Sequence, residues 1–111
     1  MPAFPMLRHK ADFDALARSG TTRSNRLLVL RTLRTDRTET RVGLSTPRSL
    51  GGAVQRNRVR RRLRELVRER HGSIGAGWDL LILARPEAAQ TRHAELRAAL
   101  GSLLELSGIG V

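Results

Sequence analysis

Residues 56–70, in the middle of the chain, contain eight arginines and only two glutamates. A guanidinium group stays charged at any physiological pH, and its planar fork can pair with two oxygens at once, which suits phosphate groups. So many like charges would repel one another in the isolated protein at low salt, which favours an anionic partner over a solvated surface. The run therefore predicts binding to a nucleic-acid backbone.

The same residues have the spacing of an amphipathic helix. Val59, Leu63, Leu66 and Val67 recur at i, i+4, i+7 and i+8, which places them on one face. At about 100° per residue, a polar set falls on the opposite face. That face carries Asn57, Arg58, Arg61, Arg64 and Arg68, and Arg60 and Arg62 flank the apolar stripe. A membrane-surface helix is the alternative, but the stripe is narrow and has no aromatic residue.

Composition limits the kind of protein. The chain has 111 residues, a formal net charge of +11 and no cysteine. We expect a single nucleic-acid-binding domain over residues 1–111, with residues 1–6 as a flexible lead-in. No apolar run reaches membrane-spanning length, and the lack of cysteine fits the cytoplasm, so we expect a soluble cytoplasmic protein without a membrane partner.

No arrangement of residues predicts a catalytic or metal site in the protein. Asp12 and Asp14 are the only close acidic pair, and on a helix residues two apart point about 200° from each other. Acids in a first helical turn are favourable, which explains this pair better than metal binding does. Glu65 and Glu69 lie among arginines, so intrahelical ion pairs are their expected role. The three histidines are far apart in the sequence.

The hydrophobic pattern predicts an α+β fold, a two-layer α/β sandwich in which helices cover one face of a small mixed sheet. The expected order is α-β-β-(β)-α-β-α, where the bracketed strand is an optional short one. Residues 21–24 are interpreted as a polar connector. The expected helices are 7–20, 56–70 and a last one through Leu96 and Leu104, and the expected strands are 27–33, 41–46 and 78–84.

At this point the residues resemble a known family. The run from Arg56-Asn57-Arg58 to Glu65 resembles the "RNR" signature of the bacterial ribonuclease P protein subunit. Residues 41–45 and 51–54 fit the family's approach to that motif. Leu7-Arg8, Asp12-Phe13, Asn25-Arg26 and the strand from Asp79 to Arg85 fall in the same order, so the resemblance covers about residues 7–107.

The resemblance implies a role in an RNA-based endonuclease, a hydrolase that removes the 5′ leader from precursor tRNA. In that family the catalyst is the RNA subunit with its bound Mg²⁺, and the small basic protein assists it. No catalytic residue and no further protein partner are expected for the chain. The family fold also implies a left-handed β-α-β crossover, where elementary rules would predict a right-handed one.

The resemblance also assigns roles to individual residues. A cleft between the first helix and the sheet would hold the single-stranded leader, at Phe13, Ala17, Arg26 and Arg31. The family often has a second aromatic residue in place of Ala17 and a tyrosine in place of Arg31, so we expect this cleft to rely more on charge than on stacking. The catalytic RNA would be bound by Arg56, Asn57, Arg58, Arg60, Arg61, Arg64 and Arg68.

Two other functions remain open from the sequence. A ribosomal-type structural protein would bind folded RNA through the same arginines but would not distinguish a precursor tRNA from its mature product. A protein-only nuclease would cleave RNA without any RNA subunit. Reconstitution with precursor tRNA and catalytic RNA separates all three.

Overall fold

The computed structural model describes residues 4–70 and 72–109, and shows three α-helices, two short 3-10 helices and one four-stranded sheet. The expected α+β fold class is confirmed, and an additional short strand is present, although it precedes the two predicted strands rather than following them. No helix in these described ranges is long and apolar enough to cross a membrane. The elements in order are α1 (Lys10–Ser19), β1 (Thr21–Ser24), β2 (Leu28–Arg34), β3 (Arg41–Ser45), η1 (Arg48–Leu50), α2 (Ala53–Glu69), β4 (Trp78–Ala84), η2 (Pro86–Gln90) and α3 (His93–Leu106).

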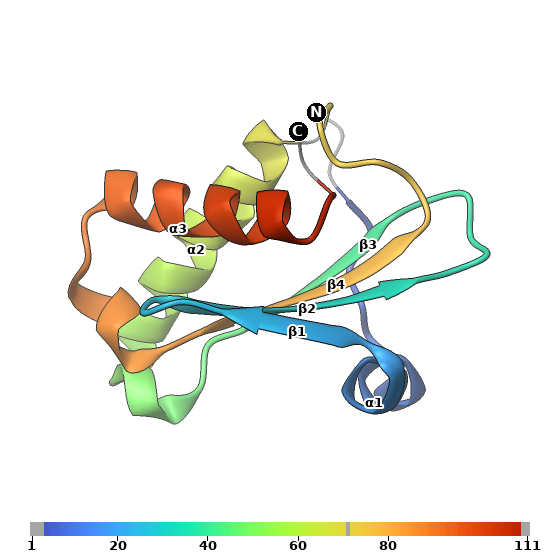
Figure 1. Cartoon of the computed structure of the whole chain (residues 1–111). Helices are drawn as coiled ribbons and strands as arrows, with labels where there is room; N and C mark the ends of the chain where they lie inside the picture. The colour runs from blue at the N-terminus through green and yellow to red at the C-terminus, as the bar shows by residue number, and fades with distance from the viewer. Residues whose placement is uncertain (1–3, 71, 110–111) are drawn as a thin grey trace.

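The sheet has the strand order β1-β2-β4-β3. Strand β2 is antiparallel to both β1 and β4, whereas β3 is parallel to β4. Parallel neighbours need a long connection, and α2 supplies it between β3 and β4 (Figure 1). The expected β-α-β crossover therefore consists of β3, α2 and β4.

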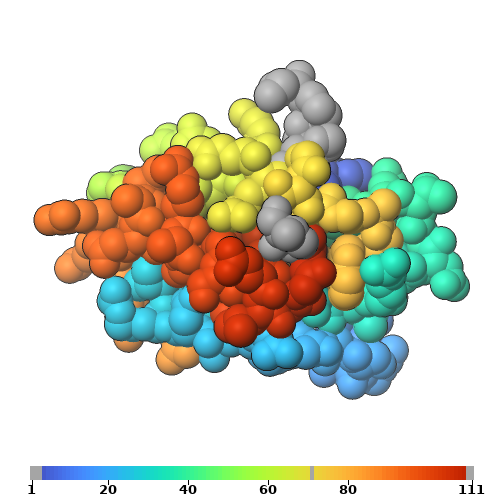
Figure 2. Space-filling view, turned by 45° about the horizontal axis from the view of Figure 1, so that its top comes forward, coloured from blue at the N-terminus to red at the C-terminus, as the bar shows by residue number. Residues whose placement is uncertain are grey.

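The main hydrophobic core lies between the sheet and the pair α2 and α3 (Figure 1). Alternate residues of the two central strands point into it, such as Leu28 and Leu30 from β2 and Leu80 and Ile82 from β4. Figure 2 shows α3 lying between α2 and the β1–β2 hairpin on this side. The helices contribute Val59, Leu63, Leu66, Val67, Leu96, Leu100, Leu103 and Leu104.

Helix α1 lies on the other face of the sheet (Figure 1). It forms a separate small core, in which Leu16 is buried with Leu7 and with Leu81 of β4. The expectation that all helices cover one face is therefore wrong for α1. Its turn into β1 is tight: a Cβ atom at Gly20 would lie 2.9 Å from the carbonyl oxygen of Thr32, so glycine allows this close approach. The periodicity of α1 gives the direction of its apolar side but not the face of the sheet that receives it.

Two segments differ from the predictions because main-chain pairing leaves no side-chain pattern. Thr21–Ser24, interpreted as a connector, forms β1, whose residues are all exposed and pair with β2. In the lead-in, Met6 forms a bridge with Val42, the amide of Val42 donates to Pro5 O (2.9 Å) and that of Leu7 donates to Val42 O (3.1 Å). This part of the lead-in is thus hydrogen-bonded to the edge of the sheet, and residues 1–3 lie outside the described ranges.

Candidate RNA interface

Helix α2 buries one side against the sheet and exposes a basic side to solvent. Val59, Leu63, Leu66 and Val67 are its buried residues, which confirms the predicted apolar face. The exposed residues confirm the predicted polar face. They include Asn57, Arg58, Arg61, Arg64 and Arg68.

The start of α2 is fixed by Gly51 and by a hydrogen bond from the backbone of Gly52 to the side chain of Gln55. Gly51 has φ = 131°, a backbone conformation that residues other than glycine rarely adopt. A Cβ atom at this position would also collide with the side-chain amide of Gln55. The Gln55 Oε1 atom accepts a hydrogen bond from the amide of Gly52 (3.1 Å), which satisfies one of the free donors at the helix start. These contacts fix the direction in which the first arginines of the helix project.

The arginines beside the apolar face have partners in the protein. Arg60 donates to Thr46 Oγ1 (2.7 Å) and Arg62 donates to the carbonyl oxygen of Thr91 (2.9 Å). Arg56 is also partly buried. Arg60 therefore has less freedom to approach RNA than the exposed arginines have, and Arg62 helps to hold α2 against the segment that precedes α3.

Carboxylates do not neutralise the exposed arginines of α2. No ion pair in the described part of the chain involves Arg58, Arg61, Arg64 or Arg68. Glu69 pairs instead with Arg97 of α3 (2.9 Å), so its expected intrahelical pairing is wrong. The positive charge on the outer side of α2 is left available to an anionic partner.

Helix α1 is held to the sheet by Arg41, whose side chain is 11% exposed. Its guanidinium donates two hydrogen bonds to Asp79 (3.0 and 2.7 Å) and two to Asp12 of α1 (both 3.1 Å). The bonds to Asp79 raise the pKa of Arg41 above its ordinary value, against the opposing effect of burial. Asp12 therefore anchors α1. The sequence feature that could have indicated this anchor is Arg41 itself, an arginine at the start of a strand whose other residues are apolar or small.

Three of the four predicted leader-binding residues lie on the α1 side of the sheet. Phe13 is partly buried and packs on the small core around Leu81. Ala17 is exposed on α1. Arg31 is partly buried, and it lies on this face because its neighbour Leu30 points into the main core.

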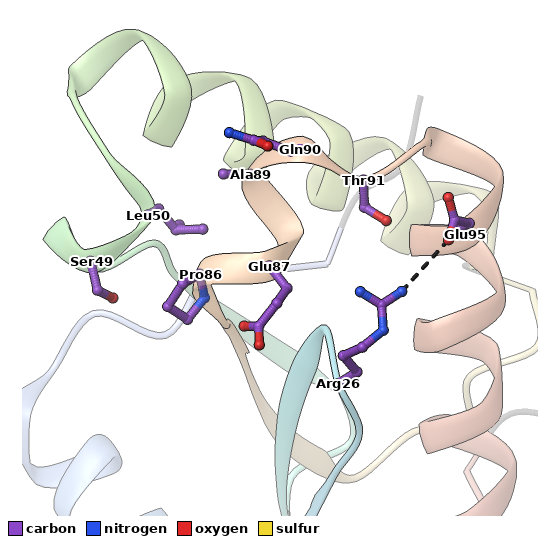
Figure 3. Close-up of a pocket in the computed structure, with 9 residues that line it drawn as sticks. All are labelled: Arg26, Ser49, Leu50, Pro86, Glu87, Ala89, Gln90, Thr91 and Glu95. Atoms are coloured by element: carbon purple, nitrogen blue, oxygen red, sulfur yellow. Dashed lines mark ion pairs between the residues drawn. The ribbon is translucent and has the colours of Figure 1, made fainter.

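Arg26 does not lie with the other three. It forms an ion pair with Glu95 of α3 (3.6 Å), on the opposite side of the sheet from α1. There it lines a cavity of about 660 Å³ between η1, η2 and the start of α3. Figure 3 shows the Arg26 guanidinium directed toward Glu95, with Glu87 on the neighbouring wall.

Comparison with known proteins agrees with this architecture. The sequence model of the Ribonuclease P family matches residues 1–107. The ribonuclease P protein component of Roseiflexus sp. (strain RS-1) is 38% identical over 104 residues, covering 93% of this chain and 85% of that protein. The corresponding protein of Streptococcus pneumoniae (strain Hungary19A-6) is 34% identical and covers 93% and 84%.

Solved structures agree as well. The RNase P protein of Staphylococcus aureus matches with a TM-score of 0.88 and 25% identity over 96% of this chain and 97% of that one. A mutant of the S. aureus protein, described as defective in mRNA degradation activity, also matches at 0.88, with 26% identity over 94% and 88%. The RNase P protein of Thermotoga maritima matches at 0.81, with 26% identity over 89% and 94%. Sequence and fold together show that this chain belongs to the ribonuclease P protein family.

Proposed function

We propose that this chain is the protein subunit of a cytoplasmic ribonucleoprotein endonuclease that removes the 5′ leader from precursor tRNA. The observation that carries the proposal is the outer side of α2, where arginines with no carboxylate partner among residues 4–70 and 72–109 project from a helix that the core holds in place. Such a surface binds phosphates by charge, and the catalytic RNA subunit is the partner that it would take. The residues proposed to contact it are Arg56, Asn57, Arg58, Arg60, Arg61, Arg64 and Arg68.

The single-stranded leader would lie along the α1 side of the sheet. Phe13 offers one aromatic ring there, Arg31 offers a charge, and Ala17 leaves the exposed side of α1 without a second ring. We keep Arg26 outside this leader site, because its ion pair with Glu95 places it beside α3.

The chemistry would belong to the RNA subunit and its Mg²⁺. Asp12 is the acid that could otherwise be suspected of metal binding, and both of its carboxylate oxygens accept hydrogen bonds from Arg41. The arginines would assist by offsetting phosphate repulsion, which lowers the Mg²⁺ concentration that the complex requires.

The first prediction is that the protein alone does not cleave precursor tRNA. With catalytic RNA at low Mg²⁺, added protein should raise the cleavage rate, because the arginines offset phosphate repulsion that Mg²⁺ ions would otherwise have to offset. The measurement is the cleavage rate across a Mg²⁺ series, with and without protein. Cleavage by a protein preparation shown to be free of RNA, and lost in Asp12→Asn, would favour a protein-only nuclease instead.

The S. aureus match gives this experiment a second substrate. Because the S. aureus mutant is described as defective in mRNA degradation activity, an mRNA should be tested beside precursor tRNA. Each substrate should be tested with and without the catalytic RNA. We expect both substrates to remain intact without the RNA subunit.

The second prediction concerns the preference for precursor over mature tRNA. Binding through phosphates should make this preference fall as salt rises, by roughly 0.7 log units per tenfold salt for each single-strand phosphate neutralised. Arg31→Ala should then lower precursor affinity and flatten the salt dependence. Phe13→Ala should mainly reduce stability, because it opens a cavity against the small core.

The measurement is the ratio of precursor to mature affinity across a salt series for wild type and both variants. If this ratio does not change with salt or in Arg31→Ala, but falls to about one in a folded Phe13→Ala protein, stacking rather than charge binds the leader. Equal affinity for the two RNAs in the wild-type holoenzyme would favour a ribosomal-type structural protein.

A further inference from the structure

A small apolar hollow lies beside the arginine side of α2. Its volume is about 130 Å³, and most of its wall is apolar. We call it the Met6 hollow after Met6, an apolar wall residue that is 37% exposed. It is lined by Phe4, Met6, Val42, Leu44, Arg64, Val67 and Arg68.

The walls of the Met6 hollow are fixed by the fold. Strand β3 is the edge of the sheet, and the segment around Met6 pairs with it through Val42. Val42 and Val67 are 2% and 7% exposed, so the floor of the hollow belongs to the main core. The hollow is thus present before any partner binds, and filling it costs little reordering of the protein.

The rim gives the hollow its specificity. Arg64 and Arg68 are one helical turn apart on the exposed side of α2, and neither forms an ion pair within the described ranges. A ligand that fits must present an apolar group to the walls and negative charge to the rim that Arg64 and Arg68 form. A nucleotide of an RNA strand does both, since its base has a π-face and its phosphate is anionic.

We propose that the Met6 hollow takes one unstacked base of the catalytic RNA, while Arg64 and Arg68 bind the phosphates beside it. The inference rests on the proposed function, because it extends the RNA surface of α2 to the segment before α1. It selects the catalytic RNA over the precursor, since the hollow is continuous with the arginines of α2 and the proposed leader site lies across the sheet with α1. The hollow would then distinguish an unpaired nucleotide from a duplex.

Crosslinking tests the position directly. Because the chain has no cysteine, Met6→Cys provides a single thiol that can carry a photoreactive group. With catalytic RNA and precursor tRNA both present, we expect a crosslink to an unpaired nucleotide of the catalytic RNA. Ser102→Cys, on the exposed side of α3, is the matched control and should give no such crosslink.

Affinity measurements test the energetics. Met6→Ala should weaken binding of the catalytic RNA about fivefold, because it removes apolar wall surface that the base would bury, and it should leave the salt dependence unchanged. Met6→Leu should bind like wild type, because the wall stays apolar. Arg64→Ala should both weaken binding and flatten the salt dependence, since it removes a phosphate contact. Thermal unfolding of each variant shows whether the fold is retained.

The outcomes separate this inference from the proposed function. If the wild-type protein does not bind catalytic RNA, both are wrong. If it binds and assists cleavage, but Met6→Ala keeps full affinity or Met6→Cys crosslinks no better than Ser102→Cys, only the hollow is wrongly assigned. A crosslink confined to precursor tRNA, or to base-paired nucleotides, also overturns the assignment.

Discussion

Replacing Arg41 with alanine is expected to lower the free energy of unfolding by about 3–5 kcal/mol, the usual cost of removing one partner from a buried ionic network. Among the described residues, Arg41 is the one cation that pairs with both Asp79, which is 4% exposed, and Asp12, which is 20% exposed. Without it, the buried carboxyl group of Asp79 would lose its two guanidinium hydrogen bonds, and α1 would lose its main polar anchor. Chemical denaturation followed by circular dichroism measures the change.

Arg97→Ala is the matched control. Arg97 also donates two hydrogen bonds to one carboxylate, that of Glu69 (3.2 and 2.9 Å), but both side chains are 49% exposed. Since water already solvates such a pair, we expect a loss of less than about 1 kcal/mol. Equal small losses in the two variants would show that the network around Arg41 does not stabilise the fold.

Leu63→Ala is expected to cost about 2–5 kcal/mol of unfolding free energy, because it opens a cavity where a fully buried side chain contacts the sheet layer. Arg61 is only two residues away on α2, but it points to solvent. Arg61→Ala should leave the thermal midpoint nearly unchanged or slightly raised, since it relieves like-charge repulsion, and should weaken RNA binding. Thermal unfolding and a salt series of RNA affinities measure the two effects.

Arg58→Ala and Arg64→Ala extend the comparison along the same exposed side. Both should resemble Arg61→Ala in stability and in weakened RNA binding. If Arg61→Ala unfolded the protein and the folded fraction bound RNA normally, the proposed orientation of α2 would be wrong.

Features that depend on one element alone could be predicted from the sequence. The arginine helix buries Val59, Leu63, Leu66 and Val67 as its spacing indicates, because the period of an α-helix fixes which side chains share a face. Strand β4 covers Trp78–Ala84 as predicted. Its run of apolar residues without alternation indicated a strand covered on both faces, and the two cores on either side of the sheet show this.

Features that depend on two distant segments were decided only by the tertiary structure. Asp12 was expected to favour its own helix start, but its partner Arg41 lies 29 residues away. The resemblance groups Arg26 with Phe13, whereas the ion pair of Arg26 with Glu95 joins the β1–β2 turn to α3. A carboxylate or guanidinium pairs with whichever opposite charge the fold brings within reach, and this distance is not a property of local sequence.

The side of the sheet that α1 covers shows the same limit. The apolar residues of α1 require burial, and either face of the sheet offers apolar residues from β2 and β4 to meet them. The short turn at Gly20, the pairing of Thr21–Ser24 with β2 and the contact of Arg41 with Asp12 together decide between the two faces. The sequence thus determined a helix with one apolar side and one arginine-rich side, and a strand buried on both sides. The tertiary structure decided which residues surround them, because hydrophobic burial is non-directional and only chain connectivity and specific polar pairs give it a direction.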